Sequence, residues 1–170
     1  MRRESRLALL AVVLAASGCH IEDRTPAGTR RDEDAVQALV AAYARSLSER
    51  DWVGTRRLFW RDGSYSGPLI PRSVGQTLPI DSALAVISRR VDGGDPASFD
   101  VRVLRTDFRQ DGDLAAVWVT LHRRMALPGG TVPTDRDYME HLVLRRIGSQ
   151  WRILSVAGSA QPRSGPTDVR

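Results

Sequence analysis

Apolar residues between positions 32 and 49 follow the period of a helix, and three acidic residues precede them. Acidic side chains at a helix N-terminus are favoured by the helix dipole. Apolar positions spaced by three, four and seven residues form one stripe along such a helix. The stripe consists of Val36, Leu39, Val40, Tyr43 and Leu47. The spacing therefore predicts an amphipathic helix over residues 32–49.

Two shorter helical patterns follow this first helix. Asp51 is placed as an N-cap for a second helix that carries Trp52, Leu58, Phe59 and Trp60 and is broken by residues 62–63. Residues 64–66 are predicted as a short strand, and residues 67–79, with three Pro and two Gly, as irregular. A third helix is expected over residues 80–91, with an apolar stripe closed by two glycines at 93–94.

From residue 99 onward the period changes from 3.6 to 2, which is typical of strands. Phe99, Val101 and Val103 alternate with polar neighbours, and Asp111-Gly112 is a hairpin turn signal. Further strands are predicted over residues 114–125, 136–147 and 151–160, with a tight turn at 148–150. Helices followed by hairpin-linked strands indicate an α+β domain with three N-terminal helices packed on an antiparallel sheet.

The first nineteen residues resemble a bacterial lipoprotein signal. Three arginines precede an uncharged apolar run over residues 7–16, which is too short to span a bilayer as a mature helix. The run ends in Ala16-Ser17-Gly18-Cys19, which resembles a lipobox and implies cleavage before Cys19 and a diacylglycerol on its thiol. The alternative is an ordinary secretory signal that happens to contain a Cys. Residue 20, which follows the Cys, is His rather than Asp, and in a bacterium with two membranes this resembles the pattern of lipoproteins sorted to the outer membrane.

This signal sets the expected domain organisation and location. We expect a signal peptide over residues 1–18, a flexible tether over 19–31, one domain over 32–160 and a flexible tail over 161–170. The protein would be exported and held on membrane lipid through acylated Cys19. It would sit on the outer membrane where two membranes are present, and otherwise on the outer face of the plasma membrane.

The high pI of the chain does not by itself indicate a nucleic-acid partner. All 25 basic residues are Arg, which is consistent with a coding preference, and loss of residues 1–18 lowers the net charge from +5 to +3. Acidic residues are interspersed with the Arg, so we expect no nucleic-acid partner. His122 and His141 are the only His of the domain and have no metal-ligand spacing, so no metal is expected. No cofactor motif occurs, and the glycine-flanked segment 63–67 has Tyr65, not Ser, at its centre.

The domain resembles the NTF2-like superfamily, which includes SnoaL-like cyclases and ketosteroid isomerase. Five segments carry the resemblance: residues 40–47 (VAAYARSL), 49–52 (ERDW), 58–65 (LFWRDGSY), 140–144 (EHLVL) and 148–153 (GSQWRI). It implies a conical cavity between a strongly curved sheet and the first helix, and dimers through the convex face. The cavity would be lined by Tyr43, Trp60, Tyr65, Trp118, Tyr138 and Glu140.

The resemblance also implies candidate catalytic residues. Tyr43 falls where ketosteroid isomerase has its oxyanion-hole tyrosine, and Glu140 where it has an acid held neutral, a worked case of pKa tuning. The general base of that enzyme aligns with Gly67, which cannot take a proton from carbon. If Trp118, Thr120 and His122 share the concave face with Glu140, His122 could act as an acid or base beside it.

Three hypotheses follow. The first is a membrane-anchored module that binds a small apolar ligand or a protein partner, in its cavity or on its sheet, and is not an enzyme. The second is a SnoaL-like or isomerase-type enzyme acting on a carbonyl compound, with Tyr43 and Glu140 as oxyanion donors and His122 in support. The third is a homodimerisation module without a ligand.

Overall fold

The computed structural model describes residues 30–70, 77–93, 98–126 and 134–160, and these form three helices and six strands. In chain order the elements are α1 (Arg30–Ser48), α2 (Trp52–Leu58), β1 (Phe59–Ser66), β2 (Leu78–Pro79), α3 (Ile80–Asp92), β3 (Ser98–Asp111), β4 (Leu114–Ala126), β5 (Thr134–Ile147) and β6 (Gln150–Ala160). The α+β prediction is confirmed. The signal peptide, Cys19 and the tail lie outside the described residues.

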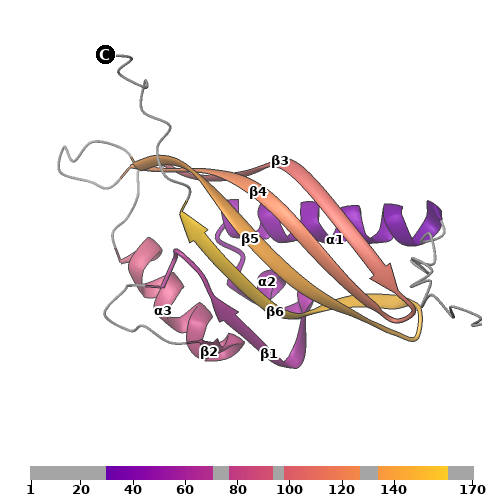
Figure 1. The fold of residues 1–170 in the computed structure, drawn as a ribbon. Coiled ribbons are helices and arrows are strands. Elements are labelled where there is room, and N and C mark those ends of the chain that lie inside the picture. The colour runs from indigo at the N-terminus through magenta and orange to yellow at the C-terminus, as the bar shows by residue number, and fades with distance from the viewer. Residues whose placement is uncertain (1–29, 71–76, 94–97, 127–133, 161–170) are drawn as a thin grey trace, which may run out of the picture.

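The strands form one sheet in the order β2-β1-β6-β5-β4-β3. The four long strands β3 to β6 pair antiparallel as successive hairpins. In Figure 1 these strands sweep across the molecule while α1 passes behind them. Register shifts in β3 after Val103 and between β5 and β6 after Val143 mark extra residues, which bend a strand and increase its twist. The bent sheet wraps around α1.

The core fills the space between α1 and the inner face of the sheet. Four of the five residues of the predicted stripe on α1, Val36, Val40, Tyr43 and Leu47, are at most 2% exposed, and the fifth, Leu39, is partly buried. Val117 and Val119 of β4 and Leu142 and Leu144 of β5 face it and are fully buried. The stripe of α3, with Ile80, Leu84, Ile87 and Val91, is buried as expected.

The prediction for residues 59–66 is wrong in part. Helix α2 ends at Leu58, so that Phe59 and Trp60 belong to β1 instead of the helix. Residues 62–63 lie within β1, where its register against β6 shifts, and do not end a helix. Strand β1 pairs parallel with β6, which brings the start of the domain beside its end. This long-range pairing overrides the helical preference of the local sequence.

Candidate functional site

A buried carboxyl group held by two tyrosine hydroxyls lies at the centre of the inner sheet face. Tyr43 of α1 donates a hydrogen bond to Oε2 of Glu140 at 3.0 Å, and Tyr65 of β1 donates to Oε1 at 3.2 Å. All three side chains are 2% exposed or less. The structure therefore brings together two residues predicted to lie side by side, Tyr43 and Glu140, and adds Tyr65 as a second donor.

Two glycines make room for this cluster. Gly158 of β6 lies directly opposite Glu140 of β5, and a Cβ there would come within 2.8 Å of Cγ of Glu140. Gly67 follows β1, and a Cβ there would lie 2.4 Å from the hydroxyl oxygen of Tyr65. The position that aligns with the isomerase base is thus occupied by the tyrosine ring. The sequence signal for this arrangement is a glycine two residues after a tyrosine, here Gly67 after Tyr65. The expectation from sequence did not include it.

Burial dominates the electrostatics of the cluster. It raises the pKa of Glu140, and the hydrogen bond from Tyr43, the charge of Arg123 and the hydrogen bond from Tyr65 lower that pKa again in part. Burial also raises the pKa of both tyrosines well above the usual value, and the neighbouring Glu140 raises it further. The hydroxyls therefore stay protonated and act as donors, while Glu140 retains a proton above the usual range of a carboxyl group.

Among the described residues, the space on the inner face beside Glu140 is small. A space of about 10 Å³ remains beside Glu140, which is room for about one water molecule. Apolar side chains from α1, β3, β4 and the segment after β1 bound it, together with Tyr138 of β5 and Arg123 of β4. The guanidinium of Arg123 lies 3.9 Å from the centre of the Tyr138 ring, a cation–π contact that holds it at this space.

The prediction that His122 approaches Glu140 is wrong. Val119 is the residue of β4 opposite Glu140, so Val117, Val119 and Leu121 share its face while Trp118, Thr120 and His122 lie on the outer face. His122 is held there between two carboxylates, 3.1 Å from Asp135 and 2.9 Å from Asp137. Trp118, Thr120 and His122 do share one face, as the alternation predicts. Which face this is depends on the register of β4 against β5, and that register places them on the outer side.

A further predicted cavity residue, Trp118, does not lie on the inner face. Trp118 stands on the outer face, stacked on His141 with 4.9 Å between ring centres. Trp60 of β1 is half-buried and has the Arg61 guanidinium 5.7 Å above its ring; like Tyr43 and Tyr65, it is not among the residues that bound the small space beside Glu140. Tyr138 does bound that space, as predicted. Within the described residues no group of three or more possible metal ligands occurs.

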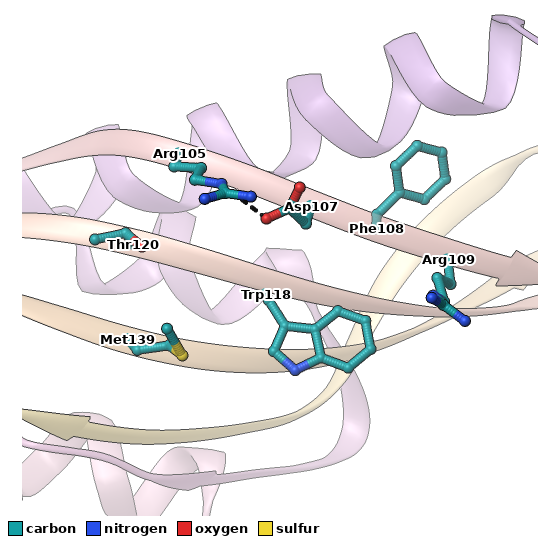
Figure 2. A pocket seen from close by; sticks show the side chains of 7 residues that line it. All are labelled: Arg105, Asp107, Phe108, Arg109, Trp118, Thr120 and Met139. Carbon is teal, nitrogen blue, oxygen red and sulfur yellow. Dashed lines mark ion pairs between the residues drawn. The ribbon is translucent and has the colours of Figure 1, made fainter.

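A larger hollow lies on the outer face of the sheet. Its volume is about 810 Å³, and it spans β3, β4 and β5. Figure 2 shows Trp118 and Met139 at its floor, with Arg105 and Asp107 joined by an ion pair on one side and Arg109 at one end. Trp118 is 39% exposed and Met139 41%. Exposed aromatic and sulfur-containing side chains ringed by charges are typical of protein-binding surfaces.

Comparison with known proteins places the chain in a family. A model of the SnoaL-like domain matches residues 29–157. A search of the curated proteins found no match. Among solved structures, the chain resembles an NTF2-like protein with a cystatin-like fold from Novosphingobium aromaticivorans (18% identity, TM-score 0.61, 79% of this chain and 85% of that one).

Two other similar structures have names that refer to reactions. One is a putative scytalone dehydratase from Novosphingobium aromaticivorans (10% identity, TM-score 0.67, 78% of this chain and 85% of that one). The other is the hexachlorocyclohexane dehydrochlorinase LinA-type3 from Novosphingobium barchaimii (13% identity, TM-score 0.66, 78% and 88%). At these identities the likeness establishes the fold alone. The match over residues 29–157 shows that the chain belongs to the SnoaL-like domain family of the NTF2-like superfamily.

Proposed function

We propose that this protein is an exported, lipid-anchored SnoaL-like domain that binds a protein partner on the outer face of its sheet. One observation carries the proposal: among the described residues the space beside Glu140 holds about one water, whereas the outer hollow around Trp118 measures about 810 Å³. Ligand pockets for small molecules are typically about 300–1,000 Å³ and concave. The space beside Glu140 is far below this range, which argues against a small apolar ligand there. The outer hollow falls within the range by volume, but its floor is formed by exposed side chains on the surface of the sheet, which favours a macromolecule.

The chemistry of the outer hollow fits a protein partner. A tryptophan at the centre with arginines at the rim is the composition of binding hot spots. The indole of Trp118 rests on His141, so it is already held in one orientation before a partner arrives. Preorganised side chains lose little conformational entropy on binding.

Loss of the Trp118 side chain tests this proposal. In native mass spectrometry of the protein purified from its host's membranes in mild detergent, we expect a complex with a protein and no retained small molecule. Trp118→Ala should weaken that complex about thirtyfold, as expected for a hot spot worth about 2 kcal/mol. Val53→Ala, which removes a 63% exposed side chain on α2, is the matched control and should leave it unchanged. A retained small molecule that survives Trp118→Ala would contradict the proposal.

The proposed lipid anchor rests on the lipobox-like segment that ends at Cys19, and it has a test of its own. Within the described residues, no helix is both long and apolar enough to cross a membrane. The intact mass of the mature chain should show that it begins at Cys19 and carries a diacylglycerol. Cys19→Ala should abolish that lipid and release the protein from the membrane fraction, while His20→Ala should not. A mature chain without lipid mass, or Cys19→Ala protein that remains with washed membranes, would count against the anchor.

A second candidate function is supported by the buried cluster. Tyr43, Tyr65 and a neutral Glu140 are hydrogen-bond donors of the kind that stabilise an enolate oxygen. The hydroxyls donate to Glu140 itself, however, and Gly67 supplies no base. The cluster therefore supports a structural role better than catalysis.

A further inference from the structure

Strand β3 forms one edge of the sheet along all of its 14 residues. Near its start this edge is closed by α1. Oγ of Ser48 accepts a hydrogen bond from the backbone N–H of Val101 at 2.7 Å and donates one to its C=O at 2.9 Å. In an antiparallel pair, alternate residues turn their N–H and C=O away from the partner strand. Val101 is such a residue, and a side chain satisfies both of its groups.

Further along β3, the outward backbone groups of such residues have no hydrogen-bond partner among the described residues. Val101 pairs with Arg123 of β4, and after the register shift the equivalent pairs are Thr106 with Val119, Phe108 with Val117 and Gln110 with Ala115. The backbone groups of Thr106, Phe108 and Gln110 therefore also point away from β4. Within the described part of the chain, no hydrogen bond reaches these backbone groups. A sheet edge of this kind is a template for another strand.

Helix α1 contacts β3 near both of its ends through side chains, and among the described residues these contacts do not reach the outward backbone groups between them. Its last residue is bonded to Val101. Near its first turn, Asp32 bonds Arg146 of β5 at 2.9 Å and also accepts a hydrogen bond from the side chain of Gln110 of β3 at 3.3 Å. Between them runs a groove of about 440 Å³, bounded on the helix by small side chains such as Ala38 and Ala41 and on the strand by Val103 and Thr106. This groove borders the edge strand at Thr106.

The charges on the outer face of this segment alternate in sign. Arg105, Asp107, Arg109 and Asp111 pair with Thr120, Trp118, Ala116 and Leu114, and all four are exposed. Figure 2 shows the first three of them along β3. Opposite charges directly across two strands stabilise the pairing, and like charges destabilise it. A row that reads plus, minus, plus, minus is complementary to its own reverse.

We propose that β3 pairs antiparallel with β3 of a second copy of this chain, with Phe108 opposite Phe108 of the second copy. In this register Thr106 exchanges backbone hydrogen bonds with Gln110 of the second copy, and the two Phe108 residues do so with each other. Asp107 then faces Arg109 of the second copy, and Arg105 faces Asp111. By symmetry there are two pairs of each kind, and the two sheets become one continuous sheet.

The charges select this register over its neighbours. Moving the second copy by one pairing step in one direction sets Asp107 opposite its own counterpart, and in the other direction sets Arg109 opposite its own. Both registers bring like charges together, which is unfavourable across strands. The extra residue of β3 at Leu104 ends the regular segment on one side, and the turn at Gly112 ends it on the other. The occupant that fits this edge is therefore a second copy.

Charge reversal tests the proposal on the full-length chain purified in mild detergent. Wild-type protein should sediment as a dimer that weakens with added salt. Asp107→Arg or Arg109→Asp alone should raise the dissociation constant tenfold or more, because each turns two attractive pairs into repulsive ones. The double variant Asp107→Arg/Arg109→Asp restores opposite charges and should return it to within about threefold of wild type. Arg102→Asp, on the same face before the register shift, should change little.

Two cysteine variants test the register itself. Hydrogen-bonded antiparallel pairs have Cα atoms about 5.5 Å apart, within disulfide range, so Phe108→Cys should cross-link two copies under mild oxidation. Thr106→Cys should not, because two such residues would lie about 13 Å apart along the strands. Trp118→Ala should leave the dimer intact, which separates this edge from the proposed partner-binding face. A monomer at all concentrations, or a double charge variant that stays as weak as the single ones, would overturn the proposal.

Discussion

Glutamine in place of Glu140 is expected to remove a component of stability that is present in acid and lost toward neutral pH. Burial raises the pKa of Glu140 in the folded protein above the ordinary value of 4.5. The folded chain therefore binds this proton more tightly than the unfolded chain does. The stabilisation is fully present below about pH 4.5 and is lost as the pH rises through the folded-state pKa. One such group gives a slope of at most about 1.4 kcal/mol per pH unit.

The contrast between wild type and Glu140→Gln isolates this effect. Exposed and paired carboxylates elsewhere in the chain contribute slopes of their own, which both proteins share. Glutamine has nearly the same shape, its carbonyl oxygen accepts from one tyrosine hydroxyl, and its amide can donate to the other. Between pH 4.5 and 8, the free energy of unfolding from urea titrations should fall more steeply for wild type than for Glu140→Gln. Glu49→Gln, at an exposed position after α1, should follow wild type. Parallel curves for wild type and Glu140→Gln would show that Glu140 titrates alike in both states.

The fold was predictable because its signals are local. The stripe from Val36 to Leu47, the turn at Asp111-Gly112 and the alternation in the later strands need only neighbouring residues. The start of β1 was not predictable in this way, because Phe59 and Trp60 continue an apolar pattern that suits a helix as well as a strand. Their conformation is decided by pairing with β6, which lies about ninety residues later in the chain.

In the candidate site, too, some features follow from the local sequence and others depend on long-range strand pairing. The resemblance placed Tyr43 near Glu140, and the structure joins them by a hydrogen bond. The face of His122 depended on the register between β4 and β5, and moving a register by one residue turns every side chain to the other face. Period-2 alternation groups Trp118 with His122 but does not say on which side of the sheet the group lies. The pairing of β4 with β5 decides on which face of the sheet these side chains lie.

A side chain at position 67 is expected to disrupt the cluster at a large cost in stability. A Cβ at Gly67 would lie 2.4 Å from the Tyr65 hydroxyl oxygen and 2.5 Å from Cζ of the ring. The ring is 2% exposed and closely packed, so it cannot move aside without losing its hydrogen bond to Glu140. Overpacking of this kind typically costs about 1–3 kcal/mol, and we expect Gly67→Ala to lie at the upper end.

The cost arises from the tyrosine and not from the backbone. Among the described glycines, positive φ angles occur at Gly112 and Gly148 and not at Gly67, so alanine is compatible with its conformation. In a Tyr65→Leu background, which removes the ring, Gly67→Ala should therefore cost at least 1 kcal/mol less, on the order of the couplings seen between residues in contact. Chemical denaturation of the four proteins of this cycle measures that coupling, and Ser66→Ala beside it serves as the control for a small change at the same site. Equal costs in both backgrounds would contradict the steric account. Gly67→Asp should be at least as disruptive, so restoring a carboxylate at this position would displace Tyr65 before it could serve as a base.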